Sequence, residues 1–177
     1  SWFYPQPVLI IGTYDENGSP DAMNAAWGGL YDGNKVELCL SAGHKTTKNI
    51  RATGAFTVSF ADAANLVASD YVGLASANTE PKKMEKSGFH LTKSQFVNAP
   101  LIDELPVAME CKLVKINEDG NVIGEIVNVS ADESVLGEDG TIDFAKFRPI
   151  SFEPVHSGYH VLGERVGNAF QDGAALK

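Results

Sequence analysis

Residues 36–60 read VELCLSAGHKTTKNIRATGAFTVSF, and this stretch decides which fold to expect. Apolar residues alternate with polar or small ones over residues 36–41 and again over 56–60, which is the two-residue period of half-buried strands. The segment between them is typical of a short helix, and Gly54 is a suitable stop. The stretch therefore predicts a strand, a helix and a second strand.

Strand and turn patterns continue on both sides of this stretch. The expected strands cover residues 8–14, 21–27, 107–116, 122–130, 150–152 and 159–162. Dense turn signals at 15–20 and 117–121 predict two hairpins, and the Gly28-Gly29 pair is interpreted as the end of the strand before it.

Four short helical segments complete the expected layout. Thr46 or Thr47 is expected to cap the helix inside the opening stretch, and Asp62 the next one. The apolar side of that next helix would carry residues Leu66, Val67, Tyr71 and Leu74. A third helix would follow Thr79 and end at Gly88, and a helical turn covers residues 143–147. We expect a mainly β fold with a few helices, in one domain over residues 1–177 and most simply a barrel.

The overall charge narrows the class of partner. The chain carries 14 basic and 23 acidic side chains, for a net charge of −9. Such a field disfavours nucleic acid and anionic membranes, and no apolar run approaches the ~20 residues of a membrane helix. Cys39 and Cys111 have no CxxC or ligand spacing, so we interpret both as small buried hydrophobes in a reducing compartment. We expect a cytoplasmic protein.

One basic cluster stands out against this acidic background. His44, Lys45, Lys48 and Arg51 fall at the expected start of a helix, where free N–H groups and the helix dipole favour a phosphate. Hydroxyls at 41, 46 and 47 add further donors. The alternative is an ordinary solvated helix face. Neither a P-loop nor a GxGxxG turn is present, so a phosphate here would belong to another type of cofactor fold.

A second segment, residues 23–27, is suited to a flat ring. Its small side chains would let a ring approach the backbone, and Trp27 could border that ring. The alternative is that Ala25 and Trp27 belong to the core. His156 and His160 have the spacing of metal ligands only in a helix, and their segment is not helical, so no metal site is expected. No nucleophile motif is present either, and no catalytic side chain is assigned.

These blocks together resemble the flavin reductase-like family, including the flavoredoxins. The resemblance is carried by residues 5–13 (PQPVLIIGT), 18–27 (GSPDAMNAAW), 41–50 (SAGHKTTKNI), 54–58 (GAFTV) and 162–170 (LGERVGNAF). It implies a six-stranded Greek-key split β-barrel that binds FMN as a homodimer. By position, the ring and its ribityl chain would be lined by Asn24, Ala25, Ala26 and Trp27. The phosphate end would be held by Ser41, His44, Lys45, Thr46 and Asn49.

One segment departs from the family pattern. Where the family often has Ser-Gly-Arg, this chain has SANT at residues 76–79, with Ser76 and Asn78 as the matching cofactor contacts. The resemblance implies an FMN oxidoreductase with NAD(P)H as a transient donor. Flavin chemistry itself requires no side-chain acid, which agrees with the lack of a catalytic motif. The alternatives are an electron carrier that serves a redox partner protein, and a nucleotide-binding barrel without redox function.

Overall fold

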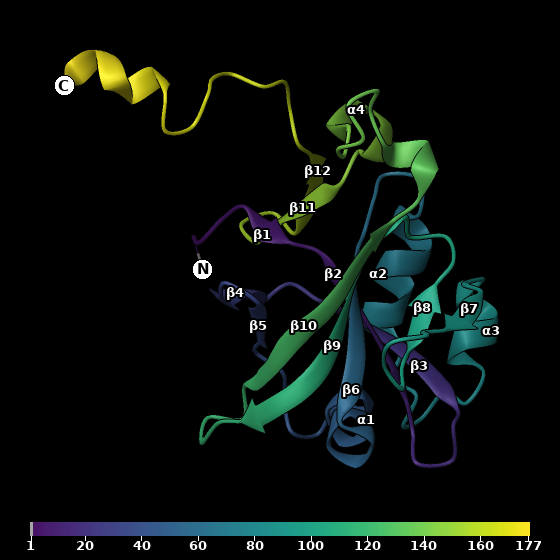
Figure 1. Cartoon of the computed structure of the whole chain (residues 1–177). Helices are drawn as coiled ribbons and strands as arrows, with labels where there is room; N and C mark the ends of the chain where they lie inside the picture. The colour runs from purple at the N-terminus through teal and green to yellow at the C-terminus, as the bar shows by residue number, and fades with distance from the viewer. Residues whose placement is uncertain (1) are drawn as a thin grey trace.

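The structure is a computed structural model and describes residues 2–177. Its main feature is a curled antiparallel sheet of seven strands in the order β3-β2-β6-β9-β10-β5-β4 (Figure 1). The bounds of these strands are β2 Leu9–Tyr14, β3 Pro20–Ala25, β4 Gly28–Asp32, β5 Lys35–Leu38, β6 Ala55–Phe60, β9 Val107–Ile116 and β10 Val122–Ala131. The expected mainly β fold with a few helices is confirmed.

The strand count differs from the expected six because of β4. The Gly28-Gly29 pair begins this strand instead of ending its predecessor. Gly28 pairs with Leu38 of β5, and a Cβ at Gly28 would lie 2.8 Å from the Glu37 carbonyl oxygen. Glycine is therefore needed at this position so that the two backbones can approach closely. In a sequence pattern, such a glycine looks the same as one that ends a strand.

Two smaller sheets complete the β structure. One has the order β1-β11-β12, with β1 Gln6–Pro7, β11 Ile150–Glu153 and β12 Gly158–Val161. The other pairs β7 Leu91–Lys93 with β8 Pro100–Ile102. The hairpin of β11 and β12 packs on the core beside α2, so the end of the chain contributes to the same body as its beginning.

The helices are short and lie at the ends and on one face of the large sheet (Figure 1). They are α1 Lys45–Thr53, α2 Leu66–Leu74, α3 Lys83–Ser87 and α4 Phe144–Phe147, with 3-10 turns η1 Glu133–Val135 and η2 Asp172–Leu176. The expected stops at Gly54 and Gly88 are confirmed, since both glycines adopt the left-handed conformation that ends a helix.

The expected caps of α1 and α2 are wrong. α1 begins at Lys45 with His44 in the cap position, so Thr46 and Thr47 both lie inside its first turn. Thr47 Oγ1 donates instead to the Ser41 carbonyl at 2.8 Å. Asp62 accepts a hydrogen bond from the Asn65 N–H at 2.8 Å, so it supports the turn before α2 and does not cap the helix itself.

The expected apolar side of α2 is also wrong in part. Val67 and Leu74 are 82% and 79% exposed, whereas Ser69 and Val72 are buried. The inward face of α2 is small because the helix packs closely on β3 through Ser69 and Gly73. A large apolar side chain on that face would hold the helix away from the sheet.

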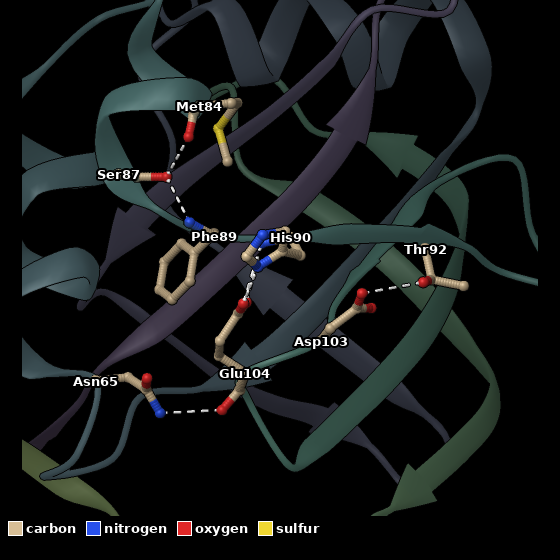
Figure 2. A network of polar contacts seen from close by, with 8 residues as sticks. All are labelled: Asn65, Met84, Ser87, Phe89, His90, Thr92, Asp103 and Glu104. Atoms are coloured by element: carbon tan, nitrogen blue, oxygen red, sulfur yellow. Dashed lines mark hydrogen bonds and ion pairs between the residues drawn. The ribbon is translucent and has the colours of Figure 1, made fainter.

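A network of polar contacts fixes the loop between α3 and β7 (Figure 2). The Glu104 carboxylate accepts from the backbone N–H of His90 and lies 2.6 Å from its Nδ1, while the Glu104 carbonyl accepts from Asn65 Nδ2 at 2.9 Å. The hydrogen bond that the Glu104 carboxylate accepts raises the pKa of His90. Thr92 Oγ1 donates to Asp103 at 3.1 Å beside this pair. These bonds tie the loop to the start of α2.

The interpretation of the cysteines holds for only one of them. Cys111 is buried in the barrel core, and burial raises the pKa of its thiol to about 12, so it is an unreactive packing residue. Cys39 is exposed, because it lies just after β5 with its side chain directed away from the core that holds Leu38 and Leu40.

The C-terminal segment leaves the body of the protein after β12 (Figure 1). Residues 162–177 are exposed throughout, and they include large apolar side chains at Val166, Phe170 and Leu176. Within residues 2–177, no helix is both long and apolar enough to cross a bilayer.

Candidate functional site

A cavity of about 230 Å³ lies where the start of α1 meets β3 and the end of α2. We call it the α1 cavity. His44, Lys45 and Thr46 line it from the helix start, and Ser76 lines it from the loop after α2. The free N–H groups of the first helical turn, a lysine and hydroxyls thus meet in one hollow, which is the chemistry that holds a phosphate.

Thr46 provides the clearest sign that this cavity takes a ligand. Its hydroxyl is buried and has no hydrogen-bond partner among residues 2–177. A buried hydroxyl left without a partner costs about 1–3 kcal/mol, so native proteins rarely retain one without a reason. A ligand oxygen in the α1 cavity would satisfy it.

The positive charges in the α1 cavity are held by carboxylates. Lys45 Nζ lies 3.2 Å from Asp15 Oδ2, in a partly exposed pair. The pKa of Asp15 is lowered, first by the backbone N–H of Ser19 and then by Lys45. Lys83 Nζ lies 3.1 Å from Asp21 Oδ1, and both side chains are only 3% exposed. Neither Asp21 oxygen has a hydrogen-bond partner, so the contact with Lys83 is an ion pair without hydrogen-bond geometry. Two lysines therefore line the cavity, one hydrogen-bonded to Asp15 and the other in close contact with Asp21 without a hydrogen bond.

A second cavity, of about 260 Å³, adjoins the first on the other side of Asn24. We call it the Tyr159 cavity. Its lining combines the small residues Ala26 and Gly73 with the aromatic rings of Phe152 and Tyr159. Those two rings are cross-strand partners on β11 and β12, with centroids 5.8 Å apart. Flat walls and small side chains suit a planar group.

Tyr159 and Asp70 form the polar corner of this cavity. The Tyr159 hydroxyl donates to Asp70 Oδ1 at 2.7 Å and so joins β12 to α2. Burial, with the adjacent Asp70 carboxylate, raises the pKa of Tyr159 to about 12. The phenol therefore keeps its proton at neutral pH, and the carboxylate acts as the acceptor.

Asn24, Gly73 and Leu74 line both cavities, so the two adjoin, and we refer to them together as the cleft. Asn24 Nδ2 donates to the Ser69 carbonyl at 2.9 Å, which fixes the side chain between β3 and α2. Gly73 makes this packing possible, since a Cβ there would lie 2.9 Å from Asn24 Cβ. The spacing of α2 and β3 thus sets the width of the cleft at its centre.

The structure brings together about half of the residues expected at the site. Asn24, His44, Lys45, Thr46 and Ser76 line the α1 cavity, and Ala26 lines the Tyr159 cavity. The remaining expected residues, Ala25, Trp27, Ser41, Asn49 and Asn78, line neither.

Those remaining residues have other roles in this conformation. Ala25 is buried in the barrel core, in the same cluster as Leu9 and Leu38. Asn49 is also buried, and its Nδ2 donates to Thr13 Oγ1 at 3.0 Å between α1 and β2. The Ser41 carbonyl accepts from Thr47 in the first turn of α1, and Asn78 Nδ2 donates to the Gly43 carbonyl in the loop before that helix. Trp27 is 63% exposed beyond the end of β3.

Several cleft residues were not expected from the sequence. They are Asp21, Asp70, Gly73, Leu74, Ala75, Ala77, Lys83, Phe152 and Tyr159. Gly73 carried the one usable signal, because a glycine inside a helical pattern often marks a close approach. Lys82 and Lys83 are adjacent in the sequence, and only the fold shows that Lys83 is the buried one.

Comparison with known proteins identifies the family to which this chain belongs. Residues 2–151 match the model of the flavin reductase like domain. Flavoredoxin of Desulfovibrio vulgaris (Miyazaki F) is 35% identical, with a TM-score of 0.93 over 98% of this chain and 95% of that one. Flavoredoxin from Methanosarcina acetivorans is 26% identical, with a TM-score of 0.89 over 99% of this chain and 95% of the other.

A third solved structure agrees in fold alone. The FMN-binding domain of a flavin reductase-like enzyme from Shewanella baltica is 22% identical, with a TM-score of 0.81 over 92% of this chain and 89% of that one. The architecture is thus the split barrel. The chain belongs to the flavin reductase-like family, and the expected resemblance is confirmed. This family defines a flavin-related redox function.

Proposed function

We propose that the chain binds FMN in the cleft and acts as an NAD(P)H-dependent FMN oxidoreductase. The observation that carries the proposal is that the two cavities adjoin and share Asn24, Gly73 and Leu74 in their walls. FMN has a phosphate at one end and a planar ring at the other, joined by a flexible chain. The α1 cavity offers donors for a phosphate, and the Tyr159 cavity offers flat walls for a ring.

The residues of the cleft fit each part of this cofactor. Lys45, Thr46 and the first N–H groups of α1 would bind the phosphate, with Lys83 behind them. Ala26, Phe152 and Tyr159 would border the ring, and Asn24 would orient the chain between. When bound, FMN accepts a hydride or electrons at its ring, and the protein supplies orientation and electrostatics. No side-chain acid or nucleophile is required.

The test begins with the visible spectrum of the purified protein. We expect a yellow protein that binds about one FMN per chain, in line with the single cleft described above. NADH or NADPH added without air should then bleach the flavin bands with saturable kinetics. Protein that takes up neither FMN nor FAD on reconstitution would contradict the proposal at its root.

A second candidate function is an electron carrier that serves a redox partner protein. It is favoured by two structural neighbours with TM-scores of 0.93 and 0.89, both of which are named flavoredoxins. The same experiment separates the two functions. Bleaching by dithionite, with neither nicotinamide reducing the flavin, would support the carrier and exclude the nicotinamide-dependent enzyme.

We also propose that the protein is a homodimer. Large apolar side chains are exposed at Trp27, Leu30 and Tyr31 along the edge strand β4, next to the Ala26 wall of the cleft. Exposed apolar clusters of this kind mark interaction surfaces. The detached segment 162–177 adds Val166 and Phe170 as groups that a second copy would bury.

Light scattering should give about twice the chain mass of 18.9 kDa. Leu30→Asp should weaken the dimer, because it places a charge in the surface that we assign to the partner. Val67→Asp is the matched control, since Val67 is equally exposed but lies on α2 away from β4. A monomeric wild type with FMN bound, or equal effects of the two variants, would contradict this interface.

A further inference from the structure

The Tyr159 cavity contains one charged side chain, and it is negative. Of the residues that line this cavity within the described chain, Asp70 is the only one with a carboxylate or a basic side chain. The ion pairs formed by residues 2–177 do not include Asp70. Lys45 and Lys83, which could offset its charge, line the α1 cavity and are paired with Asp15 and Asp21.

The hydrogen bond from Tyr159 keeps this charge in place without neutralising it. The phenol donates at 2.7 Å, and its raised pKa of about 12 keeps the proton on Tyr159 over the neutral range. Asp70 also lies one helical turn before Leu74, so its carboxylate is held on the cleft side of α2. The result is a fixed negative group, partly shielded from water, in the wall of the cavity.

We propose that Asp70, held by Tyr159, lowers the reduction potential of the FMN that binds in this cleft. The inference rests on the proposed function, because it takes the ring of FMN to occupy the Tyr159 cavity. Two-electron reduction with uptake of one proton leaves the ring one unit more negative. A carboxylate beside the ring disfavours that added charge, so reduced FMN binds less tightly than oxidised FMN.

Asp70 is in this sense a tuning residue and takes no proton or electron itself. The electrons come from a nicotinamide in the proposed reaction, or from dithionite in the test. A low potential makes the bound cofactor a strong donor, which is of use both to a reductase and to a carrier. The proposal therefore holds for either candidate function.

The test is an anaerobic redox titration of the FMN-loaded protein with dithionite and a reference dye. We expect the wild type to have a potential below that of free FMN. Asp70→Asn keeps an acceptor for Tyr159 and removes the charge. It should favour reduced over oxidised FMN by roughly tenfold, which is about 30 mV for a two-electron couple.

Two further variants separate charge from structure. Tyr159→Phe breaks the hydrogen bond but keeps the carboxylate, so the potential should stay as low as in the wild type or fall further. Glu138→Gln removes an exposed charge in the loop after η1 and should leave the potential unchanged. If Asp70→Asn and Glu138→Gln shift the potential equally, net charge is responsible and the proposal is wrong.

A second route to the same answer avoids any dependence on the Asp70 variant. Leu74 is exposed and lies four residues after Asp70 on α2, so Leu74→Lys places a cation beside the carboxylate. The potential should rise in this variant too. FMN binding with an unchanged potential in both Asp70→Asn and Leu74→Lys would overturn the inference and leave the proposed function intact. Failure of the wild type to bind FMN would overturn both.

Discussion

Replacing Lys45 with alanine should weaken FMN binding by about 10- to 100-fold and leave riboflavin binding almost unchanged. Lys45 lines the α1 cavity at the start of the helix, where it would make a charge-assisted contact with the phosphate. Hydrogen bonds to charged groups contribute roughly 1.5–3 kcal/mol, which corresponds to that range of affinity. Riboflavin has no phosphate and therefore serves as the internal reference. Fluorescence titration of the two flavins measures both affinities.

The loss of the ion pair with Asp15 in this variant should have little effect on the stability of the protein. Lys45 is 30% exposed at its side chain, and exposed ion pairs contribute at most about 1 kcal/mol. Lys48→Ala is the matched control, because Lys48 lies in the same helix but contacts Asn78 and lines neither cavity. Equal weakening of FMN and riboflavin by Lys45→Ala would show that Lys45 acts through the fold.

Thr46 offers an independent check on the same end of the cleft. Thr46→Val has nearly the same shape but removes the buried hydroxyl that lacks a partner. It should leave the flavin-free protein as stable or more so, and still weaken FMN binding. Opposite signs for stability and affinity are expected only of a group whose partner is the ligand.

Local patterns were enough to predict that the residues at the start of α1 lie together. His44, Lys45 and Thr46 are consecutive at a helix start, so their proximity follows from the chain itself. The errors near this helix have a simple cause. A helix that begins one residue earlier moves both threonines from the cap into the first turn, and Asn49 into the core. Element boundaries at that precision depend on packing.

The Tyr159 cavity could not be predicted because its walls come from distant segments. Tyr159 and Asp70 are 89 residues apart, and their contact exists only because β12 packs beside α2. Phe152 joins them through the register of β11 with β12. Nothing in the neighbouring sequence of Asp70 marks it as a cleft residue. The same holds for Lys83, whose burial results from the packing of α3 near β3.

Replacing Gly73 with alanine should reduce FMN affinity by about tenfold or more while the protein still folds. The new Cβ would lie 2.9 Å from Asn24 Cβ, whereas ordinary contacts begin at 3.4 Å. Asn24 Cβ is attached directly to the backbone of β3, so the relief must come from movement of α2 or β3 by about half an ångström. Binding sites tolerate displacements of about that size only at a cost.

Two opposing effects decide the stability of this variant. Alanine is favoured over glycine inside a helix by up to about 1 kcal/mol, but overpacking typically costs about 1–3 kcal/mol. The free energy of unfolding should therefore fall modestly. The cleft, in contrast, should be distorted at the point where its two cavities adjoin. The hydrogen bond from Asn24 to the Ser69 carbonyl would be disturbed as well.

Gly29→Ala is the matched control for Gly73→Ala. Gly29 lies in β4, and a Cβ there would meet no atom within 4 Å. FMN affinity should be unaffected by this change, and thermal unfolding of both variants should show a single transition. If Gly73→Ala binds FMN as tightly as the wild type, then the width of the cleft at Asn24 does not control binding. The ring and the phosphate would then have to occupy a path other than the one that joins the α1 cavity to the Tyr159 cavity.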